Sequence, residues 1–199
     1  MTFTEAQAIM IAMRGKSGFT IVELLIVIVV IAILAAITVV AYNGIQTRAE
    51  NTKTITAVAS YVKALKVYYA DKGNYPQLSY PFICLGSSSA SCGSNPSTSC
   101  FGSGWLQNDA GGYPAIYTAF SDALKMEIGN MPEPSTQSIS CSGSATVKGG
   151  IYYYLGSYIE LIYYLKGNSV DCGSPGGLSQ VSGYPLRSGD ATVCVVLLS

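Results

Sequence analysis

Residues 16–41 read KSGFTIVELLIVIVVIAILAAITVVA. From Leu24 to Ala41 the only polar residue is Thr38. Counted from Phe19, this run of 23 residues would form about 35 Å of α-helix. That length crosses a hydrocarbon core of about 30 Å, which a single β-strand does not do. The sequence therefore predicts a membrane-spanning helix over residues 19–41.

The charges that flank this segment predict its orientation. Arg14 and Lys16 precede it, and no charged residue follows it until Arg48. Positive residues favour the cytoplasmic side, so we expect a cytoplasmic N-terminus and an extracytoplasmic remainder. The apolar core of a cleaved secretory signal has roughly 7–15 residues, and this apolar run is longer. No clear small-x-small cleavage site follows it. An ordinary signal anchor is the stronger alternative.

Glu23 is the only ionisable residue from Phe19 through Gln46. An unpaired carboxylate in a bilayer costs several kcal/mol, so its presence favours a functional role. The alternative is that Glu23 simply lies at the cytoplasmic interface. The residue alone leaves both interpretations open.

The stretch from Lys16 to Leu25, KSGFTIVELL, resembles the processing site of type IV prepilins and pseudopilins. In that family a membrane peptidase cuts after the Gly and N-methylates the following Phe. The resemblance implies that Gly18 ends a leader, that Phe19 becomes the N-terminus and that Glu23 is the fifth mature residue. It also implies an assembly role, in which the Phe19 ammonium and the Glu23 carboxylate of adjacent subunits neutralise each other in lipid.

The similarity continues through residues 33–37 and fades after about Pro76. Many pilins carry Pro and Gly at the positions of Val40 and Ala32. Pro and Gly allow a helix to kink, so we expect a straighter membrane helix here. The segment KGNYP at residues 72–76 also resembles the end of the long helix in this family.

Beyond the membrane segment the helix is predicted to become amphipathic over residues 42–73. This prediction rests on apolar residues that follow one another at intervals of three or four and so fall on one face of a helix: Ile55, Val58, Val62, Leu65 and Tyr69. Asn43-Gly44 is a weak point in the helix, because Gly is a poor helix former. Gly73 is a suitable C-cap, and Pro76 turns the chain away.

Residues 74–199 form the predicted head, which is expected to be α+β: the long helix packed on a small antiparallel sheet. Segments rich in β-branched and aromatic residues predict strands over 151–155, 158–165 and 191–198. The first two are expected to form a hairpin around Gly156-Ser157. A short helix is predicted over 113–125 with Phe120 and Leu124 facing inward. Residues 86–104 and 130–150 are expected to be loops.

All six cysteines follow the apolar segment, and none forms a C-x-x-C pair. An even number on the extracytoplasmic side predicts disulfides rather than free buried thiols. The sequence allows about 15 pairings. Locality favours Cys84 with Cys92, leaving Cys100 with Cys141. Cys172 with Cys194 would close a late loop, which resembles the pilin habit.

Composition argues against several other functions. The formal net charge is zero and charged residues make up 11% of the chain, which removes the electrostatic case for a specific nucleic-acid partner. The absence of His excludes Ser-His-Asp and Cys-His sites. Scattered acids are expected to be solvated loop residues: Asp109, Asp122, Glu127, Glu133, Asp171 and Asp190. Calcium near Asp171 and Asp190 would need roughly six to eight oxygens, so no metal or cofactor is expected.

The sequence therefore predicts a structural, non-enzymatic subunit of a type IV pilus or pilus-like filament. Its domains would be a removed leader (1–18), a filament-core helix (19–41), the amphipathic helix (42–73) and a cell-surface head (74–199). Its partners would be other pilin subunits, the prepilin peptidase, the inner-membrane assembly platform and, before assembly, membrane lipid. The alternatives are a pseudopilin of a type II-like secretion system and a signal-anchored extracytoplasmic binding domain.

Overall fold

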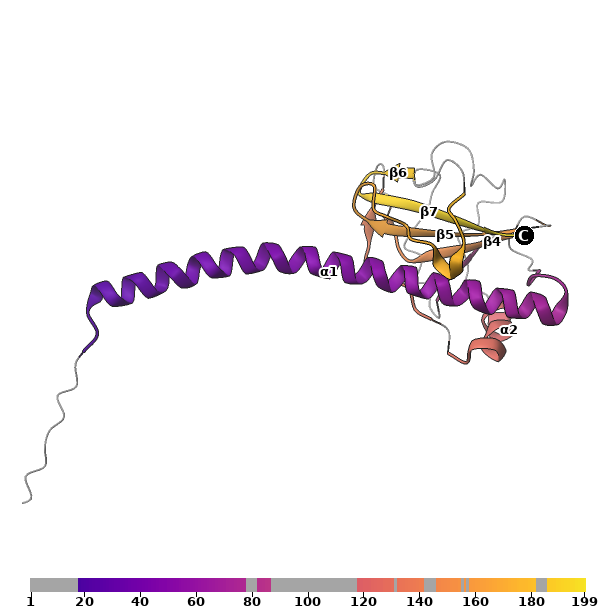
Figure 1. Ribbon diagram of the computed structural model, residues 1–199, viewed down its shortest axis with the longest axis horizontal. Coiled ribbons are helices and arrows are strands. Elements are labelled where there is room, and N and C mark those ends of the chain that lie inside the picture. Colours follow the sequence, from indigo (N-terminus) through magenta and orange to yellow (C-terminus); the bar gives the residue numbers. More distant parts are fainter. Residues whose placement is uncertain are drawn as a thin grey trace, which may run out of the picture. The chain divides into compact units, whose positions relative to one another are not determined.

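A computed structural model of the chain describes residues 18–77, 82–86, 118–130, 132–141, 146–154, 156, 158–181 and 186–199. The chain divides into two compact units, residues 1–43 and 44–199. The long helix α1 (Ile21–Lys72) contributes to both of them (Figure 1). The leader and the connection between β1 and α2 lie largely outside the described residues.

Helix α1 is continuous through Asn43 and Gly44, the predicted weak point. Its apolar residues on both sides continue the helical pattern, which outweighs the intrinsic cost of one Gly. The helix ends where the sequence predicts. Gly73 adopts a positive φ of 73°, and its N–H donates to the carbonyl of Tyr69 at 2.8 Å. This is the conformation that favours Gly after the last turn of a helix.

The head contains a five-stranded antiparallel sheet with the order β1-β4-β5-β7-β6. Its strands are β1 (Phe82–Cys84), β4 (Gly150–Tyr154), β5 (Ile159–Lys166), β6 (Leu186–Ser188) and β7 (Ala191–Leu198). The predicted hairpin is the β4–β5 pair, and the prediction for β7 has the same bounds as the strand. The α+β class is confirmed. Ser157 of the predicted hairpin turn lies outside the described residues.

Two local predictions need correction. The stretch 130–150, predicted to be a loop, contains the paired strands β2 (Ile139–Ser140) and β3 (Thr146–Val147) and the first residue of β4. Strands of two residues are too short to show an alternating pattern. Helix α2 (Thr118–Ile128) runs three residues beyond the predicted end at Lys125, because Gly129 is the residue with positive φ that ends it.

The predicted start of this helix, residues 113–117, lies outside the described part of the chain. So does most of the predicted loop 86–104. The inward orientation of Phe120 and Leu124 is confirmed, since both side chains are buried.

The sheet buries both of its faces. One face packs on the second half of α1, where the stripe residues Val58, Val62 and Leu65 are fully buried among side chains such as Tyr163 and Val196. The opposite face packs with the β2–β3 ribbon. Strand β5 is therefore buried at every position from Leu161 to Leu165, on both faces.

The predicted apolar stripe is correct at its centre and weaker at its ends. Ile55 is half-buried and Tyr69 is 44% exposed. Tyr69 lies in the last turns of α1, and its ring packs on Tyr75 with a centroid distance of 4.7 Å. It therefore fixes the chain that leaves the helix rather than filling the core.

Two buried tyrosines tie the segment after α1 to the core. The hydroxyl of Tyr152 donates to the carbonyl of Pro76 at 2.8 Å. The hydroxyl of Tyr61 accepts the N–H of Gly86 at the same distance, 2.8 Å. Burial raises the pKa of both phenols, so both act as neutral hydrogen-bonding groups.

Candidate functional site

The first residues of α1 form a helix cap around the lone acid. The backbone N–H and the hydroxyl of Thr20 each donate to Oε2 of Glu23 at 2.7 Å. In return, the N–H of Glu23 donates to the Thr20 hydroxyl oxygen at 3.2 Å. This reciprocal arrangement is a capping box, which satisfies N–H groups that the start of a helix leaves unpaired. Glu23 therefore has a local role that the sequence reasoning missed, although Thr20-x-x-Glu23 is the signature.

The predicted processing residues lie at the exposed end of the same segment. Gly18 and Phe19 are both exposed, Phe19 by 82%. Apart from its two neighbours in the chain, no described residue has an atom within 4 Å of the position that a Cβ on Gly18 would occupy. The described residues therefore leave the Gly18–Phe19 peptide bond exposed.

The first half of α1 exposes apolar side chains in every direction. Ile, Leu and Val residues from Ile21 to Val39 are between 49% and 79% exposed. The hydroxyl of Thr38 is hydrogen-bonded within the helix, because it donates to the carbonyls of Leu34 (3.0 Å) and Ala35 (2.9 Å). Among the described residues, α1 is the helix that is long and apolar enough to cross a membrane, and its most apolar stretch has no burial within the chain.

The late loop of the head is closed by the predicted disulfide. Cys172 and Cys194 are bonded, with Cα atoms 5.8 Å apart. Polar contacts reinforce this closure. The hydroxyl of Tyr163 donates to the carbonyl of Cys172 at 2.7 Å, and Gln180 Nε2 donates to the Tyr163 hydroxyl at 2.8 Å. Burial raises the pKa of Tyr163 to about 12.

Gln180 also extends the sheet at its incomplete edge. Its side-chain Oε1 accepts the N–H of Val195 at 2.9 Å, and the N–H of Val181 donates to the carbonyl of Val195 at 2.9 Å. Strand β6 pairs only with residues 191–193 of β7, so this loop covers part of the edge that β6 leaves open. A sheet edge covered in this way is protected from pairing with another chain.

The other cysteines are only partly described. Cys84 and Cys141 are both disulfide-bonded. Cys92 and Cys100 lie outside the described residues, so the pairings Cys84–Cys92 and Cys100–Cys141 stay predictions.

The described acids do not gather into a metal site. Within the described ranges, no group of three His, Cys, Asp or Glu side chains is placed to hold a metal ion. Asp171 instead accepts the N–H of Gly173 at 2.9 Å, a local turn contact. Asp190 lies in the exposed β6–β7 turn. Asp109 falls outside the described residues.

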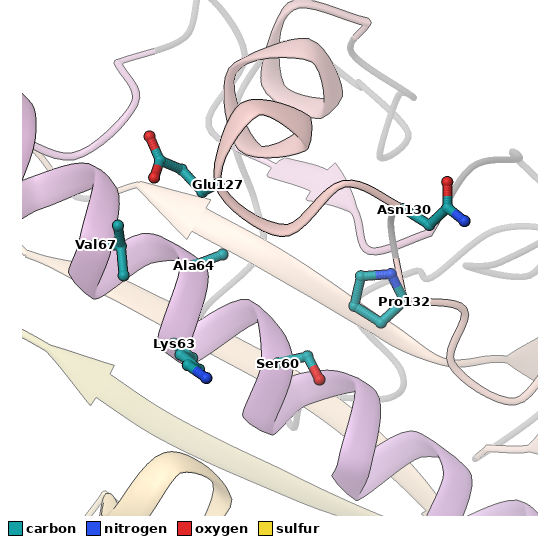
Figure 2. A pocket seen from close by; sticks show the side chains of 7 residues that line it. All are labelled: Ser60, Lys63, Ala64, Val67, Glu127, Asn130 and Pro132. Carbon is teal, nitrogen blue, oxygen red and sulfur yellow. The ribbon is translucent and has the colours of Figure 1, made fainter.

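A cleft of about 350 Å³ lies between α1, the end of α2 and Pro132 (Figure 2). Figure 2 shows that the Glu127 carboxylate and the Asn130 amide point away from the cleft floor, which includes Ala64 and Val67. A small-molecule site requires polar groups that converge on the ligand. The Glu127 and Asn130 side chains do not converge on this cleft in that way.

Comparison with known proteins matches the chain at its N-terminus. The family model for the prokaryotic N-terminal methylation motif matches residues 13–39. Fimbrial protein EcpC of Eikenella corrodens is 39% identical over 61 residues, which is 31% of this chain and 40% of that protein. The N-terminal third of this chain is therefore similar to the corresponding part of type IV pilus subunits and of type II secretion core proteins.

Two further relatives support the pilin and pseudopilin relationship. Type IV wide pilus major component PilA4 of Thermus thermophilus is 38% identical over 37% of this chain and 56% of its own length. Type II secretion system core protein G of Aeromonas hydrophila is 35% identical over 32% of this chain and 44% of its own length. The chain thus spans about half, or less, of the length of these pilin and pseudopilin relatives. No solved structure matches it at a significant level.

Proposed function

We propose that this chain is a structural subunit of a type IV pilus or pilus-like filament. The observation that carries the proposal is the first half of α1, which bears the methylation motif and leaves its apolar side chains exposed in every direction. Apolar area of this extent is stable only in lipid or against other helices. The second half of the same helix anchors a folded, disulfide-closed head.

In this proposal residues 1–18 are a cytoplasmic leader that a prepilin peptidase removes. The exposed Gly18-Phe19 bond is the cleavage site, and the Phe19 amine is methylated. The helix then holds the subunit in the membrane with its head outside, until an inner-membrane assembly platform transfers it to the filament. The Phe19 ammonium of one subunit and the Glu23 carboxylate of its neighbour neutralise each other.

A pseudopilin role is the second candidate, favoured by the similarity to type II secretion core protein G. Both roles are structural and neither requires catalysis. The third possibility is a signal-anchored binding domain. The following experiment distinguishes it from the pilin and pseudopilin roles.

Mass spectrometry of the membrane-extracted protein tests processing. The expected mature chain begins at methylated Phe19 and co-sediments with filaments sheared from cells. Gly18→Arg is expected to leave the leader attached, because the peptidase motif is lost. A chain that retains Met1, or wild-type protein absent from any sheared filament, would reject the proposal.

Glu23 allows a sharper test, because its cap and its charge can be separated. Glu23→Gln keeps a side chain that can complete a capping box but removes the charge. Glu23→Val removes both. Charge pairing between subunits predicts that both variants insert into the membrane and that both lose filament assembly, measured by sedimentation. Normal assembly of Glu23→Gln would show that only the helix cap matters.

A further inference from the structure

A short stripe of exposed residues follows the apolar run on α1. Tyr42, Ile45 and Arg48 succeed one another at intervals of three residues, so they are neighbours on the helix surface. Tyr42 and Ile45 are each 66% exposed, and Arg48 is exposed as well. The stripe therefore leads from an aromatic side chain at the end of the apolar run, through an aliphatic one, to a cation.

The head leaves this stripe uncovered. Among the residues of α1 whose side chains are described, Asn51 is the first that is buried. Its side-chain amide donates to the carbonyl of Lys166 and accepts the N–H of Lys166, both at 2.9 Å. The packing of the head on the helix is therefore fixed from Asn51 onward, beyond the position of Arg48.

The charge of Arg48 has no counter-ion within the described part of the chain. The ion pairs found there are Lys72 with Asp71 and Lys125 with Asp122. The acid nearest to Arg48 in the sequence is Glu50, and residues two apart on a helix do not face each other. The guanidinium of Arg48 is therefore available to an anion outside the chain.

The place of Arg48 in α1 brings it to the surface of a bilayer when residues 19–41 span one. Because α1 is continuous through this segment and rises about 1.5 Å per residue, Arg48 lies at most about 10 Å beyond Ala41, the end of the apolar run. The polar layer on each side of the hydrocarbon core is roughly 5–8 Å thick. Side chains of a helix lean toward its N-terminus, so the long side chain of Arg48 reaches back into this layer. Tyr42 lies at the level of the bilayer that Tyr side chains favour.

We infer that Arg48 binds the phosphate of a phospholipid on the extracytoplasmic side of the membrane, with Ile45 at the edge of the acyl chains and Tyr42 beside it. A guanidinium binds phosphate through two parallel hydrogen bonds, which a single ammonium does not reproduce. This contact rests on the proposed function, because it requires the first half of α1 to lie in lipid. It fixes the depth of the unassembled subunit, and it has to break when the subunit leaves the membrane for the filament.

Solid-state NMR of the full chain in phospholipid bilayers and phosphate-free buffer tests the contact. The guanidinium nitrogens are isotope-labelled, and lipid phosphorus attenuates their signal only at close range. The chain has three arginines, Arg14, Arg48 and Arg187. Arg48→Lys keeps the positive charge but removes one labelled guanidinium, so part of the attenuation is expected to be lost. Arg187→Lys, in strand β6 of the head, is the matched control and is expected to lose none. Arg14 is common to all three samples and cancels from the difference.

Hydrogen exchange in the same bilayers measures the depth of the helix. Arg48→Gln removes the cation and is expected to slow deuterium uptake at residues 42–47, because a neutral side chain enters the acyl region at lower cost than a charged one. Lys53→Gln removes the same charge about 18 Å of helix beyond Ala41 and is expected to leave the uptake unchanged.

Two results would contradict the inference in different ways. Attenuation that is equal in the wild type and in Arg48→Lys would overturn the phosphate contact and leave the filament proposal intact. A wild-type chain that does not insert into the bilayers, judged by flotation of the vesicles, would overturn both.

Discussion

The two halves of α1 contain similar kinds of apolar residue but bury them differently. Between Ile21 and Val39, Ile, Leu and Val side chains remain about half exposed or more. Between Gly44 and Lys72, Val58, Val62 and Leu65 are completely buried against the sheet. In the first half apolar residues surround the helix, whereas in the second they follow one face. Their distribution around the helix, rather than their number, determines whether the chain supplies its own partner.

The energetic consequence is large. Burying a Val, Leu or Ile side chain contributes about 1.5–3 kcal/mol. The second half obtains this contribution when the head folds. The first half obtains it only in lipid or among other subunits, which is why the filament proposal requires that half to stay unpaired within the chain.

The largest effect is expected from a pair of matched truncations. Leu65→Ala removes a fully buried side chain and should lower the free energy of unfolding of the head by about 2–5 kcal/mol. Leu34→Ala makes the same chemical change at a side chain that is 57% exposed. It should change head unfolding by less than about 0.5 kcal/mol. Thermal unfolding of both variants in detergent measures the difference.

Leu34→Ala, which should leave the unfolding of the head nearly unchanged, should instead lower the filament yield. Leu34→Ala removes area from the proposed helix bundle, so we expect weaker assembly from a fully stable head. Equal destabilisation of the head by both variants would show that the two halves are not distinct.

Much of this arrangement could be predicted from the sequence. The apolar run, the 3-4 spacing after it and Gly73 predict the long helix and its end, because each depends on local pattern. Strand β7 could be predicted because Ala191 to Leu198 contains a dense run of β-branched residues. The Cys172–Cys194 pairing followed from the resemblance to pilins, in which a disulfide closes a late loop.

The remaining features depend on tertiary contacts that carry little local signal. The β2–β3 ribbon consists of two-residue strands and is stabilised by packing on the second face of the sheet. The cleft between α1, the end of α2 and Pro132 arises from how segments distant in the sequence meet. The Glu23 cap is different, because Thr20-x-x-Glu23 is a local capping-box pattern that can be predicted from the sequence.

The second-largest effect on stability is expected from the disulfide that holds the loop packed on the second half of α1. Replacing Cys172 and Cys194, 22 residues apart, with Ala should lower the free energy of unfolding by roughly 3 kcal/mol. The loop should nevertheless stay docked in the folded state, because Tyr163 and Gln180 hold it independently. Denaturant unfolding measures the first effect and amide exchange of the loop the second. An unchanged unfolding midpoint would remove the stabilising role of this disulfide.

The smallest expected effect is a loss of folding stability at alkaline pH, which should arise in the head. Tyr163 ionises near pH 10 in an unfolded chain, whereas burial raises its pKa in the folded head to about 12. Between these values the unfolded state loses a proton that the folded state retains, so stability falls as pH rises. Tyr163→Phe loses the hydrogen bonds to Cys172 and Gln180 and should be about 1 kcal/mol less stable at neutral pH. Its stability should fall less steeply above about pH 10. The remaining slope is expected from the other tyrosines whose pKa values burial raises, which are Tyr61, Tyr75, Tyr152 and Tyr153. Denaturant unfolding across this range, with phenolate absorbance followed in parallel, measures both changes, and an equally steep decline in the variant would remove Tyr163 as a source of the alkaline sensitivity.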